Sequence, residues 1–123
     1  MNRAADNIRI LAASMVEKAK SGHPGGAMGG ADFINVLYSE YLQFDPQNPT
    51  WMGRDRFFLD PGHMSPMLYA QLALIGKFSM EELQQFRQWG SPTPGHPEVC
   101  YERGIENSSG PLGQGHAYAV GAA

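Results

Sequence analysis

The sequence predicts an α/β fold that is mostly helical over its 123 residues. Two observations predict the helices. Apolar side chains recur at helical spacing over residues 4–20, and a proline-led apolar segment fills residues 65–74. A third observation predicts a strand, because residues 56–60 form a short apolar run between turn signals. A Gly-His pair and then a helix follow this run, and open α/β sheets bind ligands at such strand ends.

The composition excludes several classes of protein. Hydrophobic residues make up 42% of the chain and charged residues 17%, which argues against disorder over most of its length. The net charge of −3 and the lack of a basic run argue against nucleic-acid binding. No apolar run approaches the roughly 20 residues of a membrane span, and Asp6, Asn7 and Arg9 interrupt any signal-peptide core. The lone Cys100 excludes an internal disulfide and fits a reducing, cytoplasmic compartment.

A glycine-rich stretch, residues 21–30, separates the first two predicted helices. The first helix spans residues 4–20, and Gly22 is expected to end it. The stretch reads Ser-Gly-His-Pro-Gly-Gly-Ala-Met-Gly-Gly, so half of it is glycine and the imidazole of His23 is its one reactive group. Such a backbone turns sharply and approaches other surfaces closely. A second helix is expected from about residue 26 to 41. Tight helix packing is the alternative explanation of the glycines, and it would by itself account for Gly29 and Gly30.

The second half of the chain contains further helices around an irregular segment. Ser79–Glu82 has the form of a capping box and opens a helix that is expected to run to about residue 88. Residues 89–110 contain no clear helix or strand pattern, and an irregular segment of this length in a compact domain favours a functional role. A last apolar helix over residues 116–123 has no loop after it, so we expect the chain to be part of a longer protein.

Four histidines carry the candidate chemistry. Each follows a glycine; His23, His63 and His96 lie in turn-prone sequence, while His116 opens the last apolar segment. One histidine alone is more often structural than catalytic, but four glycine-flanked rings favour a site. Structural zinc is disfavoured because no HxxxH or CxxC pair is present. The glycines also match neither a P-loop nor a dinucleotide fingerprint. We therefore expect loop-borne histidines and bare backbone to meet one polyanionic or sugar-like ligand.

Four motifs, in order and at compatible spacing, resemble those of the transketolase family. They are Lys20–Gly26, Asp55–Leu59 with Gly62-His63, Ser79–Gln88 with Gly95–Glu98, and Ser109–Gly115. The likeness spans almost all of the chain, and the last motif is similar to the family's Gly-Pro-Leu-Gly-Gln-Gly. One departure is Asp60-Pro61 before the Gly-His pair, where many relatives carry Ser-Asn or Ser-Lys.

The resemblance implies that residues 1–123 are an incomplete, N-terminal diphosphate-binding domain of a longer transketolase. Such a domain is built on a doubly wound parallel sheet. The implied reaction moves a two-carbon ketol unit from a ketose phosphate to an aldose phosphate, with thiamine diphosphate as the electron sink. Mg²⁺ or Ca²⁺ would be bound by ligands outside this segment, phosphorylated sugars would be the substrates, and the parent would be a homodimer. The segment alone is expected to be inactive.

The resemblance also assigns roles to matching residues. His23 would be the catalytic residue, because it would contact the substrate near the reacting carbons and help to move protons. His23 and His96 would both bind substrate, His96 through hydroxyl groups of the donor. His116 matches no motif histidine and is expected to be structural. The cofactor-binding residues would be His63, Gly110, Pro111 and Leu112.

Two alternatives stay open. The first is a sibling thiamine diphosphate enzyme, such as dihydroxyacetone synthase or the N-terminal subunit of a split transketolase-like pair. Pro111 favours the single-chain transketolases, because the split forms usually carry serine at this position. The second is a truncated, non-catalytic module that acts by association alone, driven by the exposed apolar surface of an incomplete core.

Overall fold

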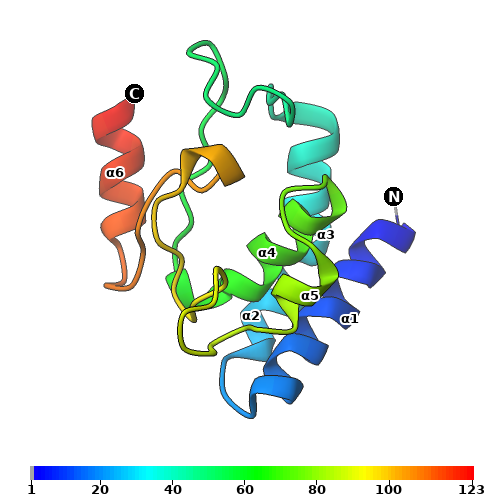
Figure 1. The fold of residues 1–123 in the computed structure, drawn as a ribbon. Coiled ribbons are helices and arrows are strands. Elements are labelled where there is room, and N and C mark those ends of the chain that lie inside the picture. The colour runs from blue at the N-terminus through cyan, green and yellow to red at the C-terminus, as the bar shows by residue number, and fades with distance from the viewer. Residues whose placement is uncertain (1) are drawn as a thin grey trace.

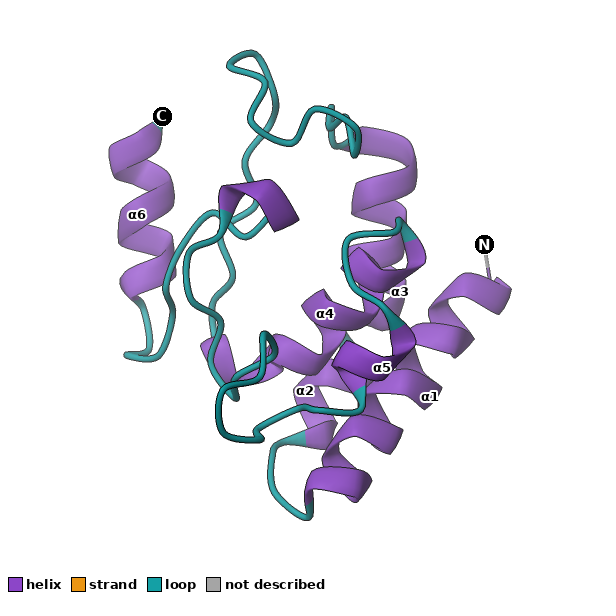
Figure 2. Cartoon of the chain, viewed as in Figure 1, coloured by secondary structure: helices purple, strands orange, loops and turns teal. Residues whose placement is uncertain are grey.

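A computed structural model describes residues 2–123 of the chain and consists of helices joined by long loops (Figure 1). The α-helices are α1 (Asn2–Ala19), α2 (Pro24–Gly29), α3 (Ala31–Val36), α4 (Ser65–Leu74), α5 (Met80–Leu83) and α6 (Gln114–Ala122). Shorter helical segments are η1 (Leu37–Tyr41, π-helical), η2 (Gly62–Met64) and η3 (Tyr101–Arg103), the last two of 3-10 type. Figure 2 shows α1–α5 gathered into one body, with α6 across extended loop segments from it.

Helix α1 follows the predicted apolar period. Ala5, Ile8, Ala12 and Met15 are buried, and α1 packs against α2, α3 and α4. The helix ends at Ala19 because Lys20 takes a left-handed conformation with a φ of 52°. The residue that ends the helix is therefore Lys20 and not the predicted Gly22, which lies two positions further along with a φ of 134°.

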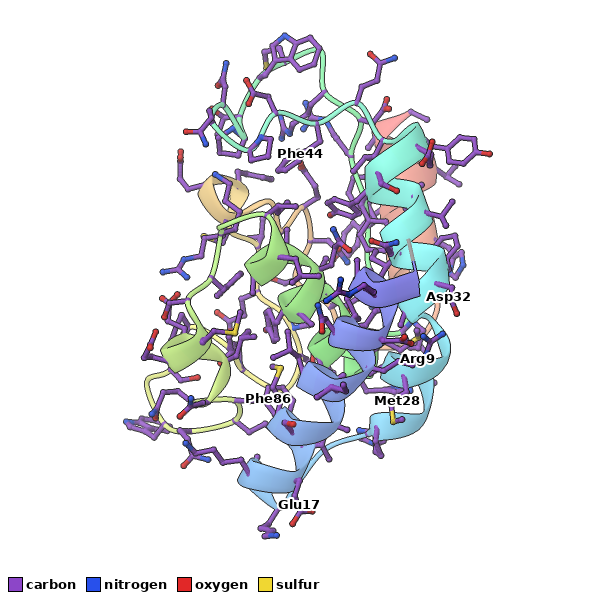
Figure 3. All side chains as sticks on the ribbon, turned by 90° about the vertical axis from the view of Figure 1, so that its right-hand side faces the viewer. Arg9, Glu17, Met28, Asp32, Phe44 and Phe86 are labelled. Carbon is purple, nitrogen blue, oxygen red and sulfur yellow. The ribbon has the colours of Figure 1, made fainter. Side chains whose placement is uncertain are left out.

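The helix predicted for residues 26–41 is divided into three consecutive segments, α2, α3 and η1. Helix α2 begins two residues before the predicted start, because Pro24 has the φ that a first helical turn requires. Gly30 separates α2 from α3 with a φ of −85° and a ψ of 0°. On the outer surface, Arg9 of α1 pairs with Asp32 of α3 (Figure 3), a kind of exposed ion pair that adds little stability.

Two of the four glycines in residues 24–30 are needed for close packing. A Cβ atom on Gly26 would lie 2.9 Å from Cγ of Met64, and one on Gly30 would lie 2.5 Å from Sδ of Met67. A Cβ on Gly25 or Gly29 would meet nothing within 4 Å. The packing explanation is thus right for Gly30 and wrong for Gly29.

Helix α4 is the centre of the core, as its apolar residues on all sides predicted. Every residue from Ser65 to Ala73 is buried, and α4 packs against α1, α2, α3 and α5. The ring of Tyr69 meets Phe78 and Phe86 edge-on, with centroids 5.4 Å and 6.3 Å apart. Burial raises the pKa of Tyr69, and its hydroxyl donates a hydrogen bond to the carbonyl oxygen of Pro94 at 2.8 Å. The core therefore holds a loop that carries one of the predicted site residues.

The run at residues 56–60 does not form the predicted strand. Residues 2–123 contain no ladder, only the isolated antiparallel bridge between Cys100 and Ile105. The backbone of Leu59 instead pairs with a side chain: its N–H donates to Oδ1 of Asn107 at 3.0 Å, and its carbonyl accepts from Nδ2 at 3.2 Å. The predicted strand is corrected accordingly, because a strand needs a neighbouring strand to complete its hydrogen bonds. The mostly helical character predicted for the chain is confirmed over residues 2–123.

Helix α5 begins with the predicted capping box. Oγ of Ser79 accepts from the N–H of Glu82 at 3.2 Å, and Glu82 Oε2 accepts from the N–H of Ser79 at 2.9 Å. The helix ends at Leu83 rather than near residue 88. Gln85 and Phe86 donate to carbonyls three residues earlier, and Arg87 takes a left-handed φ of 60° with its N–H donating to the carbonyl of Thr93 at 3.0 Å. Within the described part of the chain, no helix is long and apolar enough to cross a membrane.

The capping carboxylate predicts a pH dependence of stability. The pKa of Glu82 is lowered, first by the hydrogen bond from Arg103 and then by the one from the Ser79 N–H. Glu82 therefore stabilises the fold above its unfolded pKa of 4.5, and this contribution is lost as the pH falls through the lower, folded value. We expect Glu82→Gln to lower the free energy of unfolding at neutral pH and to matter progressively less at acidic pH. Urea denaturation across this pH range measures the difference, and a pH-independent difference would contradict the prediction.

Candidate active site

Two of the four predicted histidines meet in the folded chain, and the charges of both act on the ring of a third. The rings of His23 and His63 have centroids 4.7 Å apart and are inclined by 43°. The pKa of the exposed His96 is lowered first by partial desolvation, next by the positive charge of Arg87, and then by the charges of His63 and His23. Loops that are far apart in the sequence thus bring imidazoles together, as the sequence predicted.

Helix packing sets the contact between the first two histidines. His23 occupies the N-cap position of α2 in an extended conformation, with a φ of −123° and a ψ of 100°. His63 lies in η2, directly before Met64. Since Gly26 of α2 packs on Met64 without room for a side chain, α2 and η2 approach closely. The glycine thereby holds the two imidazoles within reach of one ligand.

The loop that carries His96 has no regular structure but is anchored on both sides. Ser65 Oγ, at the start of α4, donates to the carbonyl of Gly95 at 2.6 Å. Beyond the histidine, the N–H of Ser109 donates to the carbonyl of Pro97 at 3.0 Å. Together with the Tyr69 hydroxyl bond described above, these contacts fix the backbone on both sides of His96. An irregular segment thus becomes a fixed wall of the site.

The predicted cofactor-binding loops lie against each other. A Cβ on Gly62, next to His63, would lie 2.3 Å from Ser109 Oγ and 3.1 Å from the backbone nitrogen of Gly110. At Gly110 itself a Cβ would meet nothing within 4 Å. The Ser109 hydroxyl is buried, and among residues 2–123 it has no hydrogen-bond partner. An imidazole, bare backbone and an unpaired hydroxyl fit an anionic group such as a diphosphate. Of the other predicted cofactor-binding residues, Pro111 and Leu112 are exposed on the same loop.

Asp60, the departure noted in the sequence, holds the end of this loop. One oxygen of its carboxylate accepts from the N–H of Gly113 at 2.8 Å and lies 2.8 Å from His116 Nδ1. Gly113 is the N-cap of α6 with a left-handed φ of 89°. A Cβ on Gly115 would lie 2.6 Å from Cβ of Asp60, so the start of α6 packs directly on the end of the extended run. His116 thus lies apart from the other histidines and contacts this junction.

Sequence reasoning missed three contributors to the site: Arg87, Ser109 and the carboxylate of Asp60. Asp60 had a visible signal, because it ends an apolar run and only Pro61 separates it from the Gly-His pair. Arg87 and Ser109 gave no separate signal. As for metals, no group of three or more His, Cys, Asp or Glu side chains within residues 2–123 is arranged to hold an ion. That the metal ligands lie outside this segment stays a prediction.

The comparison with protein-family models decides the family. The model described as "Transketolase, thiamine diphosphate binding domain" matches residues 1–123. The chain belongs to this transketolase family. The resemblance drawn from the four motifs is therefore confirmed, and every candidate site residue lies within the matched range.

Individual transketolases are similar to the chain throughout its length. It is 55% identical over 120 residues to transketolase 1 of Escherichia coli, and 54% identical over 125 residues to the chloroplastic transketolase-1 of Arabidopsis thaliana. These alignments cover 97% and 100% of the chain, but 18% and 17% of the relatives. The solved transketolase of Leishmania mexicana matches 97% of the chain at 48% identity with a TM-score of 0.92, and 18% of that structure is covered. The chain thus spans less than a fifth of the length of these transketolases.

Proposed function

We propose that this chain provides one wall of the diphosphate site, together with the histidine cluster, of a transketolase. The whole protein would transfer a two-carbon ketol unit from a ketose phosphate to an aldose phosphate, and residues 1–123 would be its incomplete N-terminal domain. The single observation that carries the proposal is the 4.7 Å contact between the rings of His23 and His63. The loop of His63 in turn lies against the bare backbone of Gly110, so a substrate-facing and a cofactor-facing group would be neighbours.

The cofactor would be held by His63 and by the loop of Gly110, Pro111 and Leu112. Thiamine diphosphate, when bound, supplies the electron sink for making and breaking a carbon–carbon bond. Backbone N–H groups and the imidazole of His63 would donate hydrogen bonds to diphosphate oxygens. The hydroxyl of Ser109, buried without a partner among the described residues, is a further donor at this place.

His96 and His23 would act on the sugar. Partial desolvation and the neighbouring positive charges lower the pKa of His96, which favours the neutral ring, and a neutral imidazole has one donor and one acceptor nitrogen for sugar hydroxyls. His23 is exposed at the start of α2, where its ring is open to a ligand. It would bind the substrate near the reacting carbons and take up or give a proton at a substrate hydroxyl.

The proposal includes finer features that come with the family. They are phosphorylated sugars as substrates, Mg²⁺ or Ca²⁺ bound by ligands outside this segment, a homodimeric parent and a cytoplasmic location. The names of the relatives support the substrates, since these proteins are transketolases. The lone, half-buried Cys100 is in keeping with a reducing compartment.

A chimera tests the proposed function. Residues 1–123 replace the matching segment of E. coli transketolase 1, which aligns over 120 residues. We expect this chimera to transfer a ketol unit between sugar phosphates, and we expect His23→Ala to lower kcat by about 10²–10⁴-fold because a positioned proton-transfer group is lost. Arg3→Ala, which removes an exposed cation at the start of α1, is the control and should change kcat by less than about fivefold. A folded chimera without activity, or a His23→Ala variant with unchanged kcat, would contradict the proposal.

A further inference from the structure

Arg87 lies between the loops of two site histidines. Its Nη1 donates a hydrogen bond to Ser21 Oγ at 3.0 Å, two residues before His23. Its other side lies against Gly95, the residue before His96, where a Cβ would lie 2.6 Å from Nε and 2.8 Å from Cζ. One guanidinium thus touches both histidine loops, which are far apart in the sequence.

The protein holds this side chain in a fixed place. The left-handed backbone of Arg87 is tied to Thr93, whose buried hydroxyl in turn donates to the carbonyl of Glu82 at 2.9 Å. The guanidinium lies over the ring of Phe86, 5.7 Å from its centroid. Phe86 is buried in the core, between α1 and α5 (Figure 3). A Cβ on Gly22 would lie 3.2 Å from this ring, so Phe86 supports the first histidine loop as well.

The charge of Arg87 acts where the site needs it. Desolvation is the largest cause that lowers the pKa of His96, and the charge of the Arg87 guanidinium is the second, ahead of the charges of His63 and His23. Arg87, His96 and Glu98 line one open cavity of about 700 Å³. The Nε of Arg87 is buried and, among residues 2–123, has no hydrogen-bond partner. Burying a donor without a partner costs free energy, and this is the position that Arg87 Nε takes against Gly95.

We propose that Arg87 is a positioning residue that ties the His23 loop to the His96 loop, so that both imidazoles face one sugar substrate. This inference rests on the proposed function of the two histidines. Its physical basis is that a displacement of about 1 Å in a positioning element costs up to about 100-fold in rate. Arg87 itself need not touch the substrate.

Three substitutions in the chimera separate two properties of Arg87: its hydrogen bond to Ser21, here called the bridge, and its positive charge. Arg87→Gln removes both, Arg87→Lys keeps the charge but loses the planar fork, and Ser21→Ala removes the acceptor of the bridge. We expect each to raise KM for the ketose donor, by about tenfold or more for Arg87→Gln. The control is Arg3→Gln, which changes an exposed cation at the start of α1 and should leave KM unchanged.

A readout that does not depend on activity is the titration of His96. The pH dependence of its carbethoxylation, followed by mass spectrometry of the peptide that contains it, reports its pKa. Because the Arg87 cation lowers this pKa, we expect the midpoint to move to higher pH in Arg87→Gln and to stay in place in Arg87→Lys and Ser21→Ala. If Arg87→Gln does not fold, Arg87→Lys and Ser21→Ala still test the bridge through KM.

The outcomes separate this inference from the proposed function. Unchanged KM in Arg87→Lys and Ser21→Ala, or an unchanged His96 midpoint in Arg87→Gln, would overturn the role of Arg87 even if the chimera is active. An unsubstituted chimera that folds but transfers no ketol unit would overturn the proposed function. In that case the shift of the His96 midpoint would still test the placement of Arg87.

Discussion

Replacing Glu106 with glutamine is expected to lower the free energy of unfolding by about 3–5 kcal/mol. Glu106 accepts two hydrogen bonds from Arg54, from Nε at 2.7 Å and from Nη2 at 3.0 Å, and each of the two side chains is only 4% exposed. A second cation, Arg56, has its Nη1 3.7 Å from the same Glu106 carboxylate. The amide would leave the Arg54 charge buried without a counter-charge. Urea denaturation of the chain, followed by circular dichroism, measures the loss.

Two further variants isolate the cause. Glu17→Gln breaks an ion pair with Lys20 in which both side chains are exposed, and it should cost less than about 1 kcal/mol. The double variant Arg54→Met/Glu106→Leu removes both buried charges, so it should recover much of the stability that Glu106→Gln loses. If Glu106→Gln cost no more than Glu17→Gln, the buried pair would not be the constraint described here.

Gly62→Ala is expected to weaken cofactor binding more than any other single methyl group added to the site. The new Cβ would lie 2.3 Å from Ser109 Oγ and 2.9 Å from the carbonyl carbon of Ser109. The hydroxyl can rotate away, but the backbone can yield only if the loop of Gly110 moves off the loop of His63. Overpacking of this kind costs about 1–3 kcal/mol, which corresponds to about 5- to 150-fold in affinity for thiamine diphosphate.

Calorimetric titration of the chimera with thiamine diphosphate and Mg²⁺ measures this effect. The matched control is Gly29→Ala, because its Cβ would meet nothing within 4 Å and α2 accepts alanine readily. We expect the control to bind the cofactor as the unsubstituted chimera does. Equal affinities for the Gly62→Ala and Gly29→Ala chimeras would show that the two loops do not act together on the cofactor.

The helices could be predicted where local sequence decides the structure. Pro66 and a largely apolar segment predicted α4 from its first residue to its last, and the Ser79–Glu82 capping box predicted the start of α5. The end of α5 could not be predicted, because nothing in the local pattern indicates the change to hydrogen bonds of three-residue spacing after Leu83 or the contact of Arg87 with Thr93. The strand prediction failed for a related reason. The apolar run at residues 56–60 has no neighbouring strand, and the backbone of Leu59 pairs with the side chain of Asn107 instead.

The candidate site was predictable in its members and not in its geometry. A preceding glycine marked His23, His63 and His96 in the sequence. The contact between the rings of His23 and His63, however, depends on the packing of Gly26 between α2 and η2. Side chains that connect distant loops were missed, since Asp60 reaches Gly113 across 53 positions and Arg87 reaches Ser21 across 66. Such contacts form only when the tertiary fold brings the loops together.

The most direct test is whether residues 1–123 form a partial diphosphate site that needs the rest of a longer transketolase. Thiamine diphosphate with Mg²⁺ is titrated calorimetrically into the isolated chain and into the chimera with E. coli transketolase 1. We expect the isolated chain to bind more weakly than about 1 mM, or about 4 kcal/mol of binding free energy. We expect the chimera to bind tightly and to lose affinity on His63→Ala. Tight binding by the isolated chain, or no effect of His63→Ala in the chimera, would contradict this assignment.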